Sequence, residues 1–410
     1  MGINDVRSQK DNKEGLGSFN GQLLTPSHIG DLNRSRVIQA FCDHGPLSRA
    51  ELAKMAGVTR ATIGNIVTAL IDAGVIEEGE PRDSTGKVGK RGRPLWFGPR
   101  AGLSGGVAIG EGRFEAALIN ARGEVLESTR GDFDPLDSKG ASAIAAITRG
   151  LDKVIPESIE DLLGIGVAVP GVCDTATGEI MGSGQVPGLA GSGLVEAIRS
   201  RFHLPVVLDN DSRAQALGEK WFGKGRGIPT FASVQTGDGI GVGMVISGTI
   251  YRGRRGEAGE AGHCSVVKDG ELCRCGLRGC WETIATLRWL RAEASRLGLP
   301  NADGLDARAL VDLAEDGSTD ASSLLEEYAN NLAIGLANLA QILSLRFFIL
   351  HGDAVGGGET FRALTEKKTK EHVLEYLREE LEVVLSELDQ RAGLLGAAGL
   401  VLSETFHLSI

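Results

Sequence analysis

Aromatic side chains and long apolar runs are scarce in this chain. Only 5% of its 410 residues are aromatic, and no apolar run approaches the roughly 18 residues that a membrane-spanning helix needs. The longest run, residues 392–402, is interrupted by glycines and is predicted to form buried core. A secretory leader is also lacking, so we expect a cytoplasmic protein without disulfide bonds or a membrane partner.

Composition and charge indicate a multidomain globular protein. The 42% apolar content is ordinary, and the length allows two or three domains. The net charge is −11, yet residues 1–100 carry a slight excess of basic side chains, which favours a nucleic-acid contact confined to the N-terminus. Glycine, with 59 residues, has about twice its usual share. This excess predicts loops that approach a phosphate or another ligand.

Residues 260–282 hold four of the six cysteines and one histidine. A thiolate-rich Cys3His set is typical of a closed, tetrahedral structural zinc site. The predicted ligands are His263, Cys273, Cys275 and Cys280. The alternatives are disulfides or reduced cysteines that happen to lie together, but Cys273 and Cys275 are too close in sequence for an easy disulfide. The remaining distant cysteines, Cys42 and Cys173, are predicted to be small buried side chains.

The N-terminal hundred residues read as a tail followed by a DNA-binding unit. Residues 1–29 are polar and lack hydrophobic periodicity, which predicts a disordered tail. The first helix is expected to begin near Asp31, with Leu32 on or near its apolar face. Ser48 and Glu51 form a capping box for a short helix with Met55 inward, and Gly57 supplies the turn to another helix.

Two short helices joined by a glycine turn predict a helix-turn-helix, and the second would enter the major groove of DNA. A packing unit without a DNA role is the alternative. Residues 82–100 contain six basic side chains and one acidic one, which indicates a basic hairpin beside the second helix. The region 30–100 is therefore predicted to be a winged helix-turn-helix, with DNA contacts from Arg60, Thr62, Asn65, Arg91 and Arg93.

From residue 101 to residue 410, strands alternate with helices, which predicts an α/β fold. Asn210 and Asp211 follow an apolar strand, where open α/β sheets place ligand contacts. They are predicted to bind sugar-like hydroxyls, with Asp211 as a base, or else to cap the next helix. A glycine-rich turn that could hold a phosphate comprises Thr236, Gly237, Gly239 and Gly241.

Several of these motifs together resemble one family. They are GIGVAVPG from Gly164, DNDSRAQALGE from Asp209, TGDGIGVG from Thr236, GEAGH from Gly259 and CRCGLRGCWE from Cys273. The chain from about Asp31 resembles the ROK family, specifically its NagC/XylR-type regulators, in which a winged helix-turn-helix precedes an actin- and hexokinase-like sugar-kinase fold of two lobes. The resemblance implies zinc on the four ligands above. It also implies a sugar site lined by Asn210, Asp211, Glu260, His263 and Glu282.

One departure from the family affects the expected activity. Kinases of the family carry an Asp-x-Gly-Gly-Thr-Lys-type loop on the first strand, whereas this chain reads Ala108, Ile109, Gly110, Glu111, Gly112, Arg113. Phosphoryl transfer depends on electrostatic positioning that such a loop supplies, so we expect a degenerate ATP site. The sequence favours a dimeric or tetrameric, sugar- or phosphosugar-responsive repressor of carbohydrate genes that binds double-stranded DNA. An ATP-dependent sugar kinase, or a kinase that also regulates, is the alternative.

Overall fold

The computed structural model describes residues 26–80, 92–156, 161–388 and 390–410. Most of the predicted tail and one predicted DNA contact, Arg91, lie outside the described residues. Within the described ranges, no helix is long and apolar enough to cross a membrane.

The N-terminal unit is a three-helix bundle with a small sheet. The helices are α1 Pro26–His44, α2 Arg49–Ala56 and α3 Arg60–Asp72, and the strands β1 Leu47–Ser48, β2 Ile76–Glu78 and β3 Pro94–Phe97 pair in the order β1-β3-β2. The capping box is present, because the Glu51 amide donates to Ser48 Oγ and the Ser48 amide donates to Glu51 Oε2. Gly57 ends α2 at φ +64°, a conformation that favours glycine. The predicted helix-turn-helix is thus confirmed.

Three local expectations for this unit were wrong. Helix α1 begins at Pro26, before the expected Asp31. Proline is favoured in a first helical turn, because its missing amide hydrogen would have no partner there. The first turn also lacks the apolar periodicity by which the start of the helix was predicted. Leu32 and Met55 are 40% and 50% exposed rather than inward. In α2, Leu52 and Ala53 are buried instead, so the core-facing stripe of this two-turn helix is filled without Met55.

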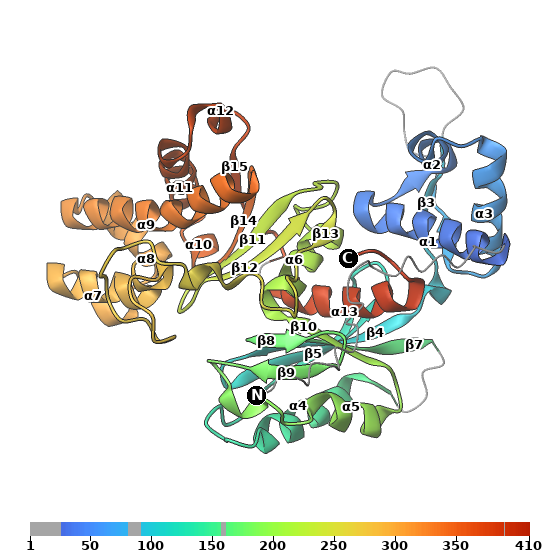
Figure 1. Ribbon diagram of the computed structural model, residues 1–410, viewed down its shortest axis with the longest axis horizontal. Coiled ribbons are helices and arrows are strands. Elements are labelled where there is room, and N and C mark those ends of the chain that lie inside the picture. Colours follow the sequence, from blue (N-terminus) through green and yellow to red (C-terminus); the bar gives the residue numbers. More distant parts are fainter. Residues whose placement is uncertain (1–25, 81–91, 157–160, 389) are drawn as a thin grey trace, which may run out of the picture.

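Two five-stranded sheets form the two lobes of the larger domain (Figure 1). The first sheet has the order β10-β7-β4-β5-β6, and the helices α4 and α5 pack on it. Its buried core is lined by apolar strand residues such as Val107 and Val167. The bounds are β4 Leu103–Gly110, β5 Arg113–Asn120, β6 Val125–Asp132, α4 Ala141–Val154, β7 Leu162–Val169, α5 Leu194–Phe202 and β10 Val206–Asn210, with the hairpin β8 Val172–Asp174 and β9 Glu179–Gly182 beside it.

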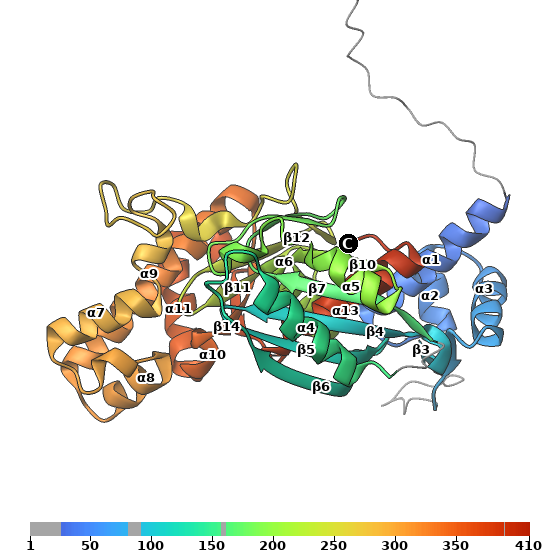
Figure 2. The same ribbon diagram turned by 90° about the horizontal axis from the view of Figure 1, so that it is seen from below.

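The second sheet has the order β13-β12-β11-β14-β15, and a group of helices covers it at the end of the molecule far from the N-terminal unit (Figures 1 and 2). The strands are β11 Phe231–Thr236, β12 Gly241–Ile246, β13 Thr249–Ile250, β14 Phe347–Gly352 and β15 Glu382–Leu385. The helices are α7 Leu287–Leu297, α8 Ala307–Glu315, α9 Thr319–Leu343, α10 Asp353–Gly356, α11 Gly358–His372 and α12 Glu375–Arg378. The two-lobed α/β prediction is confirmed.

Two helices, α6 Asp211–Phe222 and α13 Arg391–Phe406, lie between the two sheets (Figure 1). Helix α13 packs on the first sheet, and α6 packs on α13 and on the second sheet. The apolar run 392–402 lies in α13 and is buried, as predicted. A Cβ at Gly166, Gly218 or Gly396 would collide with a backbone carbonyl of the facing element. Part of the glycine excess therefore serves close packing of helices and not ligand approach.

Candidate metal and sugar site

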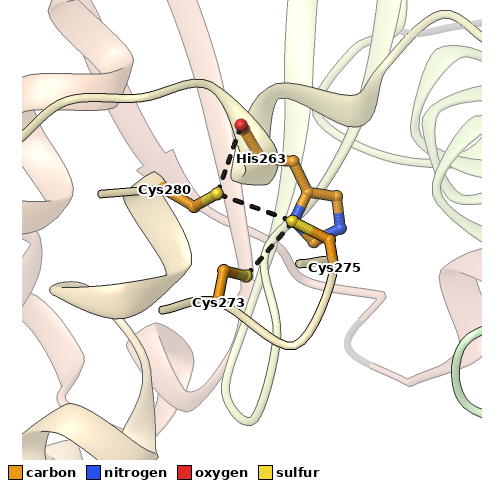
Figure 3. Close-up of side chains that lie close together, drawn as sticks. All are labelled: His263, Cys273, Cys275 and Cys280. Atoms are coloured by element: carbon orange, nitrogen blue, oxygen red, sulfur yellow. Dashed lines mark hydrogen bonds between the residues drawn. The ribbon is translucent and has the colours of Figure 1, made fainter. Parts of the chain in front are cut away.

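The four predicted metal ligands lie together in one loop (Figure 3). Their ligand atoms are all within 4.8 Å of one another. The Cys275 and Cys280 sulfurs are 3.7 Å apart, and two sulfurs bound tetrahedrally at about 2.3 Å from one zinc ion would be about 3.8 Å apart. The spacing of the donors therefore suits one tetrahedral ion.

The histidine of this group has different neighbours at its two ring nitrogens. His263 Nδ1 lies 3.7 Å from the Cys273 sulfur, on the metal side. His263 Nε2 lies 3.9 Å from Glu260 Oε2. A metal-bound imidazole commonly has its other nitrogen beside a carboxylate, which fixes the ring orientation. The geometry thus assigns Nδ1 to the metal side and Nε2 to the side of Glu260.

The ionisation of the thiols also fits a divalent cation. Burial and the adjacent Cys275 and Cys273 thiols raise the pKa of Cys280 to about 12. Burial opposes ionisation of Cys275 as well, but hydrogen bonds from the Leu277 backbone and the neighbouring thiols lower its pKa. A bound divalent cation would favour the thiolate forms of Cys275 and Cys280, which metal ligation requires.

The loop is anchored on the second lobe by the residue that follows the last cysteine. Trp281 is 1% exposed, and its indole Nε1 donates to the carbonyl of Asn331 on α9 at 2.9 Å. Its ring packs where Gly335 leaves no Cβ in the way. Cys264, next to His263, is exposed and stands outside the four-residue group. The loop is thus fixed to the second lobe at Trp281 and exposed at Cys264.

Asn210 and Asp211 lie at the start of α6. The Asn210 side chain accepts from the amides of Ser212 and Arg213, and its Nδ2 donates to Gly171 O and Asp211 Oδ1. The helix-capping alternative therefore describes Asn210 in this structure. Asp211 Oδ1 accepts from the Ser212 amide at 2.8 Å, whereas its Oδ2 accepts no hydrogen bond from the described residues.

The environment of Asp211 favours its protonated form. Burial raises the pKa of Asp211 to about 6, hydrogen bonds from Ser212 oppose the rise, and the negative charge of Glu260 adds to it. That charge effect requires Glu260 to lie near Asp211. His263 lies 3.9 Å from Glu260 Oε2 and 3.8 Å from Glu282 Oε2, so these three residues form a row of contacts, with Asp211 near Glu260. Four of the five predicted sugar-site residues are thus brought together, and Asn210 adjoins them.

A buried ion-pair network behind α6 was not found from the sequence. Asp209, 1% exposed, accepts from Arg213 Nε at 2.6 Å and from Arg252 Nε at 2.8 Å. Arg213 also donates to the carbonyls of Gly256 and Ala258, just before Glu260. The network therefore links the start of α6 to the segment that carries Glu260. Asp209 lies in strand β10 and Arg213 in the first turn of α6, so no helical spacing in the sequence signalled the pair.

Glu282 connects the metal loop to the glycine-rich turn between β11 and β12. It is 8% exposed, and its Oε1 accepts from the Ile240 amide at 2.9 Å. Arg274, between two of the cysteines, donates to Asp238 O in the same turn. The structure thus places Glu282 between metal loop and turn.

The hydroxyl of Thr236, the first residue of the predicted phosphate turn, is used within the framework. The residue is buried, and its hydroxyl donates to His351 O and accepts from the Ala354 amide. Gly241 packs against the Ser212 side chain at the start of α6, and Gly239 lies beside Glu282. Gly237 has φ +142° and open space around its Cβ position. The phosphate contact of this turn, Thr236, Gly237, Gly239 and Gly241, remains a prediction.

The segment Ala108–Arg113 forms the end of strand β4 and a tight hairpin into β5. Ala108 pairs with Glu115 across the hairpin, and Gly110 pairs with Arg113. Gly112 has φ +68°, and Glu111 and Arg113 are exposed. An exposed carboxylate stands at this turn.

The described DNA-contact candidates are exposed on the N-terminal unit. Arg60, Thr62 and Asn65 are exposed in the first half of α3. The Thr62 hydroxyl is hydrogen bonded to Thr59, which caps the helix. Arg93 is exposed and lies 4.0 Å from Glu78 across the β2–β3 hairpin. These positions agree with a recognition helix and a wing, and their contacts with DNA remain predictions.

Comparison with known proteins agrees with this architecture of a helix-turn-helix followed by a two-lobed sugar-kinase-like domain. A model of the ROK family matches residues 104–404, and a winged helix-turn-helix DNA-binding model matches residues 31–77. The chain belongs to the ROK family.

Three similar proteins include both regulators and a kinase. The xylose repressor of Caldicellulosiruptor bescii is 28% identical over 391 residues, covering 92% of this chain and 96% of that protein. A ROK family transcriptional regulator that is a homolog of the E. coli MLC protein has a similar fold (TM-score 0.73, 24% identity, 93% of this chain and 97% of that chain). A ROK glucokinase from Streptomyces griseus, solved with glucose and AMPPNP, matches 73% of this chain and 99% of its own, with 30% identity and TM-score 0.63.

Proposed function

We propose that this protein is a sugar-responsive transcriptional repressor that binds operator DNA as a dimer or tetramer. The observation that carries the proposal is the joining of a winged helix-turn-helix to a ROK domain in one chain, over nearly the whole length of a known xylose repressor. The effector would be a sugar or phosphosugar, and the regulated genes those of carbohydrate uptake or catabolism.

The row of carboxylates is the proposed effector site. A sugar hydroxyl would donate to Asp211 Oδ2, and neighbouring hydroxyls would reach Glu260, His263 and Glu282. Asn210 would join by exchanging its Asp211 contact for a sugar hydroxyl. Because the Asp211 side of the site belongs to α6 and the other side to the metal loop, a bound sugar would favour one relative position of the two lobes.

The proposed metal is one structural zinc ion on His263, Cys273, Cys275 and Cys280. Zinc would hold the loop in shape and orient His263, so that Nε2 remains directed to the sugar side. The effector itself would be bound by the protein's own carboxylates, which accept hydrogen bonds from its hydroxyl groups.

A panel of sugars in a thermal-shift assay of the zinc-loaded protein tests this proposal. A ligand that binds only the native state raises the melting temperature, so at least one of D-xylose, D-glucose, N-acetyl-D-glucosamine and their phosphates is expected to do so. The same sugar should then change the affinity for a DNA duplex selected by the protein from a random library. Asp211→Ala should abolish the sugar response and leave sugar-free DNA binding intact. An unchanged response in this variant would contradict the site.

A sugar kinase is the second candidate. It is favoured by the similarity to the glucokinase and by Asp211, whose pKa of about 6 suits a general base. The Ala108–Arg113 hairpin opposes it, since Glu111 adds negative charge where the family positions ATP phosphates. A coupled ATP assay with the same sugars separates the two: the repressor proposal predicts no turnover above background, and robust turnover would establish a kinase.

A further inference from the structure

Helix α6 connects the proposed effector site to the DNA-binding unit. It begins with Asp211 and ends at Phe222, and twelve residues at 1.5 Å per residue span about 18 Å. Nearly all of its residues between these ends are buried. The helix lies between the lobes (Figure 1) and also packs against α1. Its two ends therefore belong to different functional parts of the protein.

The C-terminal end of α6 is joined to α1 by an ion pair. Lys220 Nζ contacts Asp43 Oδ1, with the lysine side chain 4% and the aspartate side chain 27% exposed. The ammonium group also lies 5.9 Å from the centre of the Trp221 ring. Both oxygens of Asp43 accept from Gln39 Nε2, one helical turn earlier on α1. The pair is thus shielded from water, and its aspartate is held in one orientation.

The C-terminal residues of the chain provide a second connection between the same two places. Arg252, which binds Asp209 at the start of α6, donates through Nη1 to Ile410 O at 2.9 Å. The neighbouring Ser409 amide donates to Gln39 Oε1 at 2.9 Å. A series of polar contacts therefore runs from Asp209 through the C-terminus to the residue that holds Asp43.

Apolar side chains pack around the junction between α6 and α1. Trp221, at the end of α6, belongs to the same buried cluster as Phe41 and Cys42 of α1 and Leu408 near the C-terminus. Arg226, just beyond α6, donates to Trp221 O and packs against Gly45 after α1. A shift of α6 along or about its axis must therefore displace α1 or break the Asp43–Lys220 pair.

We infer that the Asp43–Lys220 ion pair is the contact through which effector binding at the start of α6 changes the position of the DNA-binding unit. The inference rests on the proposed function and adds its route of regulation. A sugar on Asp211 shifts α6, and the shielded ion pair transfers that shift to α1, which packs against the recognition helix α3. Loss of the pair is expected to uncouple the two activities without removing either one.

The test uses the full-length double variant Asp43→Asn/Lys220→Met. Changing both residues avoids an unpaired buried charge, which would destabilise the fold by itself. DNA affinity is measured by fluorescence anisotropy with a labelled duplex selected by the wild type, with and without D-xylose, D-glucose and N-acetyl-D-glucosamine, and sugar affinity is measured by calorimetry. The matched control is Lys224→Met/Glu387→Gln, a lysine–glutamate pair just after α6 that does not involve α1.

We expect wild type and control to show a sugar-dependent change in DNA affinity in the usual range for coupled sites, about 5- to 150-fold. In the double variant this ratio should fall to within about twofold of unity, while the sugar dissociation constant and the melting temperature stay close to wild type. A double variant that keeps the full response overturns the inference alone. A double variant that loses sugar affinity overturns it too, because the pair would then serve the sugar site. A wild type that responds to none of the sugars overturns the proposed function, and the inference with it.

Discussion

The metal loop and the start of α6 contribute the two sides of the proposed effector site, and they are held in place in different ways. The loop takes its four metal ligands from 18 consecutive residues, His263 to Cys280, and rests on the second lobe through Trp281. The start of α6 is held by a buried network, in which Asp209 and Arg213 reach to Gly256 and Ala258. The proposed metal ion would hold one side, whereas contacts between distant segments hold the other.

Removing a metal ligand should have the largest effect of all. Structural zinc supplies on the order of 10 kcal/mol to the folding of small zinc domains, so Cys273→Ser should lose the ion and unfold the loop while the lobes remain folded. Metal content by mass spectrometry and hydrogen exchange across residues 264–280 measure this. Cys264→Ser is the control, because Cys264 lies outside the ligand group. Loss of metal in the control variant would contradict the assigned ligand set.

Breaking the buried network should destabilise the whole domain by a smaller amount. Arg213→Met leaves the Asp209 carboxylate buried with Arg252 as its remaining partner, and removal of one partner of a buried pair costs about 3–5 kcal/mol. Urea unfolding measures the loss. Arg199→Met, which breaks an exposed pair with Glu196, should change stability by less than about 1 kcal/mol. Equal losses in both variants would contradict a special role for the buried network.

The smallest of the three effects depends on pH. The pKa of Asp211 is about 6 in the folded protein, above its ordinary value of 3.8, so the folded state binds the proton more tightly than the unfolded state. The protonated Asp211 carboxyl therefore adds to the free energy of unfolding below pH 4, and this contribution is lost as the pH rises to about 6. Asp211→Asn lacks this loss and should be more stable than wild type by up to about 3 kcal/mol at pH 7.5, with little difference at pH 4. Urea titrations at both pH values test this, and a difference independent of pH would exclude Asp211 as its source.

Local signals in the sequence predicted the parts of the molecule that are themselves local. The metal ligands are close together in the chain, and the capping box of Ser48 and Glu51 needs only three residues. The structure brings the four predicted ligands together and contains the capping box. Asn210 was predicted with two alternatives, and its capping role became visible only in the hydrogen bonds that it accepts from the Ser212 and Arg213 amides.

Contacts between distant segments could not be predicted from the sequence. Lys220 and Asp43 are 177 residues apart, and nothing in their neighbourhoods distinguishes them from ordinary surface charges. The glycine excess was interpreted as ligand loops, because a glycine needed for helix packing looks the same in a sequence as one needed for a turn. The partners of the Thr236 hydroxyl, His351 and Ala354, were equally hidden, because they come from a different strand and helix.

The close contacts at Gly166, Gly218 and Gly396 have an evolutionary consequence. Each of these residues faces a backbone carbonyl so closely that even alanine would force the two elements apart. A repressor can acquire a new effector by exchanging side chains around Asp211 while these three positions stay fixed. Among diverging proteins of this kind, these three glycines should therefore change less often than the residues that select the sugar.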